Sequence, residues 1–244
     1  MLQHRFVRRP GASARALVGH RRSMGSDFAL AKVLAFIAGA ANAGGFFALG
    51  QYTSHMTGYL SQFADSLASG GFAVAGVAAW AVSSFTGGAA LSSLLINWAR
   101  LRHSRQRYAI PLAVQGAFLV CFAVAGVLGG PAGRLLSLGC LCFIMGMQNA
   151  TITKISYARV RTTHATGMVT DIGIEFGRAL CGMLFPQSGI SMHHQKLRIL
   201  SSLIGAFLIG GLAGAAGFHA MGFAVFLLLA GILFALSLPS LLRR

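Results

Sequence analysis

Acidic side chains are scarce in this chain, and two of them stand four residues apart. The four acids are Asp27, Asp65, Asp171 and Glu175, against 20 Lys and Arg. On a helix, Asp171 and Glu175 would share one face with Arg178, which follows Glu175 by three residues. Carboxylates in this arrangement can bind a cation or a proton, with an affinity that the arginine adjusts. The alternative is a solvent-exposed helix on which Glu175 and Arg178 form a local ion pair.

Two short polar motifs occur twice, in the same order. The pattern G-x-x-N-A stands at 39–43 and again at 146–150. Each copy is followed by the pattern H-x-T-G, at 55–58 and at 164–167. The recurrence of two patterns in one order indicates an internal duplication.

The threonines and glycines of these motifs suit the binding of a small solute. Thr57 and Thr166 can supply hydroxyl groups, and free backbone amides at the start of a following helix can hold an anion. Gly58 and Gly167 are predicted to allow backbone geometries that a helix does not adopt. We therefore expect both motifs to line a binding site.

The amides and imidazoles near the motifs have two interpretations each. Asn42, Gln148 and Asn149 lie inside apolar runs, where an amide can bond to a neighbouring helix or line a solute site. His55 and His164 could titrate near neutral pH, or they could be structural. Neither histidine has other ligands at a spacing that would hold a metal.

Three further polar residues are candidates for contact with charge. Asp65 could pair with a charge from the other half of the chain, or lie in water. Arg161, followed by Thr162 and Thr163, could bind an anionic group. The commoner role for such an arginine is to extend its charged end to a membrane surface.

Composition excludes a water-soluble domain. Hydrophobic residues make up 55% of the chain, charged residues 10%, and the mean hydropathy is +0.70. A soluble domain carries about 25% charged residues. The basic residues cluster at the ends of apolar runs, which argues against a nucleic-acid partner in spite of the net charge of +16. The fold class is therefore predicted as an all-α polytopic membrane bundle, embedded among membrane lipids.

Apolar runs of the length needed to cross a bilayer occur six times. They lie at about 28–50, 72–98, 108–128, 135–152, 199–218 and 221–238. Two polar stretches, 51–71 and 153–182, are predicted to be either extramembrane loops or re-entrant segments. We expect a single transmembrane domain over 27–244.

The basic residues predict the orientation, because cytoplasmic loops are enriched in Lys and Arg. Residues 1–26 are expected to form a basic, disordered cytoplasmic tail. If only the six apolar runs cross, the basic stretches at 100–107, 153–163, 196–198 and 243–244 also lie inside. Both termini are then cytoplasmic, and the basic stretches would meet anionic lipid headgroups.

Each repeated half, about 28–128 and 132–240, contains three apolar runs. An odd number of crossings places the two halves in opposite orientations. Inverted repeats of this kind are typical of secondary transporters, in which broken segments of the two halves approach each other near the membrane midplane.

Four stretches resemble a known family. Residues 38–50, 55–58, 146–150 and 161–173 are similar to the signature blocks of the YoaK family of bacterial multi-pass membrane proteins, a domain of unknown function. The resemblance extends over about 28–240. It implies a multi-pass protein of the bacterial inner membrane, with a transport role often inferred and no settled substrate.

This sequence departs from the family pattern at two positions. Asn42 stands where the family has Asp, and Tyr59 stands where it has Asn. The first departure removes a carboxylate, and with it any proton coupling through that position.

The sequence thus predicts a secondary transporter or permease for a small solute or ion. Asp171 and Glu175 are the predicted ion or proton ligands, and Asn42, Asn149, Thr57 and Thr166 the predicted solute contacts. A channel or a non-transporting scaffold is the alternative, and a membrane-embedded enzyme is a third reading that lacks a convincing nucleophile and acid/base set. No cofactor is implied, and the oligomeric state is left open.

Overall fold

A computed structural model describes residues 24–102, 108–128, 130–155 and 165–242, and these residues are almost entirely helical. The helices are α2 (Met24–Leu49), α3 (Met56–Ala68), α4 (Phe72–Leu101), α5 (Ala109–Leu128), α6 (Gly130–Ile155), α7 (Ala165–Leu184), η1 (Pro186–Ser188), α8 (His194–Met221) and α9 (Ala224–Leu241).

Six of these helices are long and apolar enough to cross a bilayer: α2, α4, α5, α6, α8 and α9. They coincide with the six predicted runs. The predicted fold class, an all-α bundle with six candidate spans, is therefore confirmed for the described part of the chain.

The structure describes one helix in each polar stretch of the sequence, α3 in the first and α7 in the second. Each follows the first span of its half, α2 or α6, and precedes the next span, α4 or α8. Acidic residues interrupt the apolar residues of both helices, Asp65 in α3 and Asp171 and Glu175 in α7. Length and composition do not qualify either helix as a candidate span.

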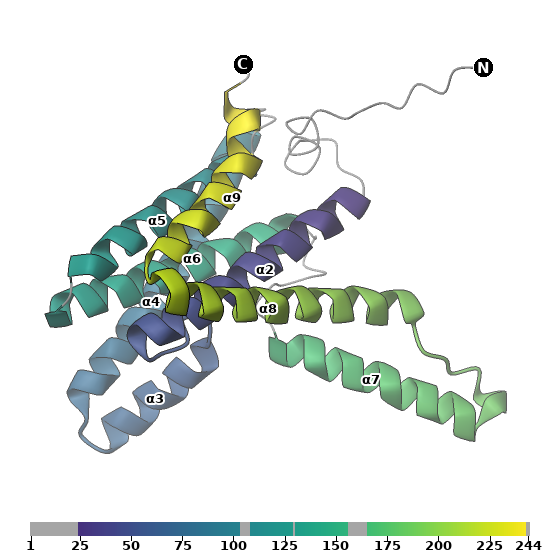
Figure 1. Cartoon of the computed structure of the whole chain (residues 1–244). Coiled ribbons are helices and arrows are strands. Elements are labelled where there is room, and N and C mark those ends of the chain that lie inside the picture. Colours follow the sequence, from purple (N-terminus) through teal and green to yellow (C-terminus); the bar gives the residue numbers. More distant parts are fainter. Residues whose placement is uncertain (1–23, 103–107, 129, 156–164, 243–244) are drawn as a thin grey trace, which may run out of the picture.

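The helices pair in a pattern that repeats between the two halves. Helix α2 packs along α8, α6 packs along α4, and α5 packs along α9. Helix α3 lies on α4, and α7 lies on α8, so each half carries a helical hairpin that projects from the bundle (Figure 1). If α2, α3, α4 and α5 are exchanged for α6, α7, α8 and α9, the α2–α8 pair becomes the α6–α4 pair and the α3–α4 pair becomes the α7–α8 pair. The α5–α9 pair is converted into itself.

The α2–α8 crossing depends on glycine. Gly39 of α2 lies against the carbonyl of Phe207, and Gly210 of α8 lies against the carbonyl of Phe36. A Cβ atom at either glycine would overlap the opposing backbone. Glycines of this kind let two membrane helices approach until their backbones touch.

The α6–α4 crossing has the same construction. Gly146 of α6 lies against the carbonyl of Phe85, and Gly88 of α4 lies against the carbonyl of Phe143. All four helices therefore carry the pattern F-x-x-G at the contact. In both crossings, the glycine of one helix faces the phenylalanine carbonyl of the other.

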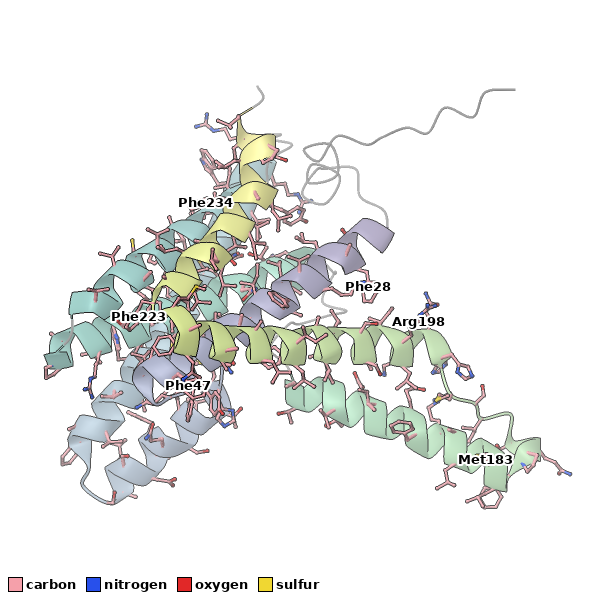
Figure 2. The ribbon with its side chains drawn as sticks, viewed as in Figure 1. Phe28, Phe47, Met183, Arg198, Phe223 and Phe234 are labelled. Carbon is pink, nitrogen blue, oxygen red and sulfur yellow. The ribbon has the colours of Figure 1, made fainter. Side chains whose placement is uncertain are left out.

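The largest buried cluster lies where α2, α5, α6, α8 and α9 meet, around side chains such as Leu34, Phe122, Ile144 and Phe226. The α7–α8 hairpin extends beyond this core. Met183, near the tip of the hairpin, is 78% exposed (Figure 2).

Candidate functional site

A cavity of about 400 Å³ lies where the two repeated motifs meet. It is lined from four sides: by the connection into α3, by the starts of α3 and α7, by the middle of α4 and by the last turns of α6. The lining residues are Ser54, His55, Met56, Thr57, Phe85, Ala89, Asn149, Ala150, Thr153 and Thr166. The repeat-related threonines, Thr57 and Thr166, thus line one space, although they belong to different halves of the chain.

The connection from α2 to α3 turns back into the bundle. Helix α2 ends where Gly50 adopts a positive φ of 73°, a conformation that glycine tolerates best. The backbone N–H and the hydroxyl of Ser54 then donate to Oδ1 of Asn42, at 3.2 and 3.0 Å. Asn42 precedes the end of α2 by seven residues, which is about 10 Å along a helix. Asn42 therefore positions the segment that lines the cavity and is not itself a lining residue.

A second hydrogen bond fixes the same connection from the other side. The hydroxyl of Tyr59, on α3, donates to Oε1 of Gln51 at 3.1 Å. Tyr59 is 5% exposed and packs with Leu138 and Cys142 of α6. Burial raises the pKa of Tyr59, so its hydroxyl remains a donor.

The two motif glycines are helical, which contradicts the prediction that they release the backbone from helical geometry. Gly58 is the third residue of α3, and Gly167 is the third residue of α7. Gly58 is small for a different reason: the ring of His55 lies against its Cα, where a Cβ would overlap the ring. At Gly58, glycine accommodates a side chain that borders the cavity.

The two amide side chains of α6, Asn149 and Gln148, have different roles: one lines the cavity, and the other bonds to a neighbouring helix. Asn149 lines the cavity. Gln148 does not line it, and its Nε2 donates to the carbonyl of Leu34 on α2 at 2.6 Å. Gln148 therefore links two helices, and its Oε1 has no hydrogen-bond partner among the described residues.

A buried polar triad beside the cavity was not anticipated from the sequence. The hydroxyl of Thr151 donates to the carbonyl of Met147 at 2.8 Å, so it accepts from Ser92 at 2.8 Å and from Gln115 at 3.3 Å. These contacts join α6 to α4 and to α5. The available signal was the presence of polar side chains inside apolar runs, but their partners lie far away in sequence.

Other cavity residues were also missed, namely Ser54, Met56, Phe85, Ala89, Ala150 and Thr153. Ala150 ends the second G-x-x-N-A motif, and Thr153 follows it closely. Phe85 and Ala89 belong to the α4–α6 crossing. Membership of these residues in one site depends on how the helices pair, which a linear pattern does not show.

The predicted ion ligands lie elsewhere, in the α7–α8 hairpin. The side chain of Glu175 is 2% exposed, and its Oε2 accepts from the backbone N–H of His193 at 2.8 Å. Arg178 and Lys196 each approach it to 3.7 Å. The hydrogen bond from the His193 backbone, reinforced by the His193 ring and Lys196, lowers the pKa of Glu175.

Asp171 pairs with Lys196 at 3.1 Å, and both side chains are half exposed. Asp65 is exposed on α3 and has no ion pair among the described residues. None of the three acids lines the cavity, and their role in ion binding stays a prediction. The candidates Arg161, Thr163 and His164 fall outside the described residues.

The described residues hold no group of three or more His, Cys, Asp or Glu arranged for a metal ion. The residues that line the cavity include four with hydroxyl groups: Ser54, Thr57, Thr153 and Thr166. Asn149 adds an amide and His55 an imidazole. This set can hydrogen-bond a small polar molecule.

Six helices that are long and apolar enough to cross a bilayer are typical of a multi-pass helical membrane protein. Residues 30–238 match the family described as "Protein of unknown function (DUF1275)", and the chain belongs to this family. No curated protein and no solved structure matches it.

Proposed function

We propose that the chain is a secondary transporter that binds a small polar solute in the central cavity. The observation that carries this proposal is the position of Thr57 and Thr166, which are equivalent in the two motifs and line the same space. A site at the interface of two repeats is typical of secondary transporters that work by alternating access, because movement of one half against the other opens the site to either side.

The helix pairing supports a 3+3 inverted repeat. The α2–α8 and α6–α4 crossings use the same F-x-x-G contacts, as expected if the halves are copies related by a two-fold axis. The return of Ser54 to Asn42, about 10 Å before the end of α2, supports a re-entrant connection. In agreement with the resemblance to the YoaK family, the proposed location is the bacterial inner membrane, with both termini in the cytoplasm.

The proposal is tested by solute flux. Purified protein is first screened against metabolites for thermal stabilisation, and the strongest ligand is then followed in proteoliposomes. Thr57→Val and Thr166→Val remove one hydroxyl each at nearly constant volume. Each variant should reduce ligand affinity about tenfold, because one hydrogen bond and the desolvation of its partner amount to roughly 1–3 kcal/mol.

Thr86→Val is the matched control. The Thr86 hydroxyl is bonded within α4 to the carbonyl of Val82 at 2.9 Å and does not line the cavity. Its removal should leave flux unchanged. Unaltered flux in folded Thr57→Val and Thr166→Val would exclude the cavity as the solute site.

A carrier is distinguished from a channel by counterflow. Solute trapped inside the vesicles should accelerate the uptake of labelled solute by a carrier. A channel would instead give a conductance that does not saturate, and a scaffold would give neither signal.

A further inference from the structure

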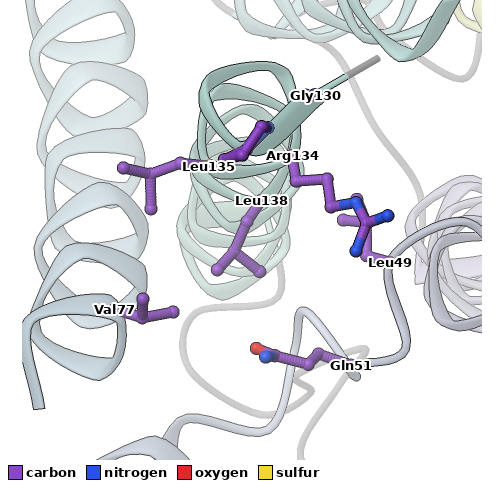
Figure 3. Close-up of a pocket in the computed structure, with 8 residues that line it drawn as sticks. Leu49, Gln51, Val77, Gly130, Arg134, Leu135 and Leu138 are labelled. Atoms are coloured by element: carbon purple, nitrogen blue, oxygen red, sulfur yellow. The ribbon is translucent and has the colours of Figure 1, made fainter. Parts of the chain in front are cut away.

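A second cavity, of about 450 Å³, lies near the start of α6. Its walls are mostly apolar, and two of its residues carry strong hydrogen-bond donors. The lining residues are Leu49, Gln51, Val77, Gly130, Pro131, Arg134, Leu135 and Leu138. Figure 3 shows Arg134 and Gln51 on opposite sides of this space, on α6 and on the connection after α2 respectively.

Arg134 has no hydrogen-bond or ion-pair partner among the described residues, and no acid lines the cavity. It stands one turn after the start of α6. A cation near the N-terminus of a helix is electrostatically unfavourable, so this position does not stabilise α6. When the two F-I-x-G blocks at 36–39 and 143–146 are aligned, the position of Arg134 is held by Asp27 in the first half. The positive charge of Arg134 therefore has no equivalent at the corresponding position of the first half.

The amide of Gln51 is oriented by its neighbour. Because Tyr59 donates to Oε1 of Gln51, the remaining end of the amide, Nε2, is a donor. Nε2 has no partner among the described residues. The cavity thus presents the guanidinium of Arg134 and the amide N–H groups of Gln51, and Leu49, Leu135 and Leu138 line it as well.

We propose that this cavity binds an amphiphilic anion, in which a phosphate or carboxylate group is held by Arg134 and Gln51 and an apolar chain lies against the leucines. The guanidinium of Arg134 is exposed and is therefore available to an anionic ligand, and its geometry matches phosphate and carboxylate. The apolar walls favour a ligand that also carries hydrocarbon. The ligand can be the headgroup of an anionic lipid or a free organic anion, and both share this chemistry.

Trp80 gives a direct readout of binding. Its Nε1 donates to the carbonyl of Leu135 at 2.9 Å, so the indole touches the cavity wall. The chain has 2 Trp, so Trp98→Phe leaves Trp80 as the single tryptophan. This protein, in neutral detergent, is titrated with octyl phosphate, and with octanol and inorganic phosphate as the two separate halves of the ligand. Octyl phosphate should change the fluorescence at concentrations at which neither half does.

Two variants test the donors separately. Arg134→Gln should weaken octyl phosphate binding about tenfold or more, the loss expected for a charge-assisted hydrogen bond. Gln51→Glu should weaken it similarly, because a carboxylate would both pair with Arg134 and repel the ligand. Arg198→Gln, which removes an exposed arginine on α8 outside the cavity, should bind as the parent does. Far-ultraviolet circular dichroism confirms that each variant is folded.

Native mass spectrometry separates the two sources of ligand. Phosphatidylglycerol that copurifies with the parent, is displaced by octyl phosphate and is absent from Arg134→Gln identifies a lipid site. Octyl phosphate binding without retained lipid identifies a site for a free anion. The proposal is overturned if octyl phosphate does not bind the parent, if octanol binds equally well, or if folded Arg134→Gln and Gln51→Glu both bind as tightly as the parent.

Discussion

At the scale of single residues, Asn42 illustrates how one acceptor controls a site that it does not line. Its Oδ1 receives both the backbone N–H and the hydroxyl of Ser54, so the chemistry needed at this position is that of an acceptor. A carboxylate oxygen can accept the same two hydrogen bonds. The positional role does not require a titrating group.

Substitution of Asn42 tests this interpretation. Asn42→Asp should preserve ligand binding and thermal stability, because Oδ1 remains an acceptor. Asn42→Leu should lower both, with a loss of about 1–3 kcal/mol in stability for two unpaired, partly buried donors. Thermal unfolding with and without the solute found by screening measures both effects. Equal behaviour of the Asp and Leu variants would contradict the acceptor role.

Glu175 should make stability depend on acid pH. Its pKa in the folded protein lies below the ordinary value of 4.5, chiefly because the His193 backbone donates to it. Its contribution is therefore complete above that ordinary value and is lost as the pH falls through the lower, folded pKa. The melting temperature of the parent should fall in this acidic range, and that of Glu175→Gln should fall less.

Asp65→Asn provides the control for Glu175. Asp65 is exposed and has no ion pair among the described residues, so neutralising it should leave the pH profile of the melting temperature unchanged. A profile for Glu175→Gln that matches the parent would show that Glu175 does not fasten the hairpin.

At the scale of helices, the glycine crossings set the spacing of the bundle. Gly39→Ala places a methyl group against the carbonyl of Phe207, and Gly146→Ala does the same at Phe85. Each should destabilise the protein by about 1–3 kcal/mol, the usual cost of overpacking. The two effects should be similar, since the contacts are equivalent. Reversible unfolding in mixed detergent micelles measures them.

Gly205→Ala is the matched control on α8. No atom lies within 4 Å of a Cβ placed at Gly205, so only the helix propensity changes, which favours alanine by roughly 0.5–1 kcal/mol. A destabilising Gly205→Ala, or a neutral Gly39→Ala, would contradict the close approach of α2 and α8.

Helices were predictable from the sequence to the extent that they depend on local pattern. The six apolar runs gave six helices, and the convergence of Thr57 with Thr166 follows from the repeated H-x-T-G motif. The helical state of Gly58 was missed, because the reason for a glycine there is the ring of His55. The bond from Ser54 to Asn42 and the triad around Thr151 were also missed. Such contacts depend on which helix faces which, and hydrophobic periodicity does not contain that information.

At the scale of the whole molecule, the number of crossings predicts which ends of the helices share a side of the membrane. Two spans separate Arg102 from the N-terminal residues, and a third separates it from Arg134. Single cysteines at positions 3 and 102, in a background without the native cysteines, should react with an impermeant maleimide only from the cytoplasmic side. A cysteine at 134 should react only from the outside. Labelling of 3 and 102 from opposite sides would remove the inverted-repeat interpretation.

The short connection at 51–55 lies between the two cavities. Gln51 belongs to the wall of the arginine-containing cavity, whereas Ser54 and His55 belong to the wall of the central one. The connection at 51–55 therefore contributes to the walls of both cavities. Asn42 holds it to α2 through Ser54, and Tyr59 holds it to α3 through Gln51. Gln51 and Ser54 are three residues apart, so a substitution that reshapes this connection alters the walls of both cavities.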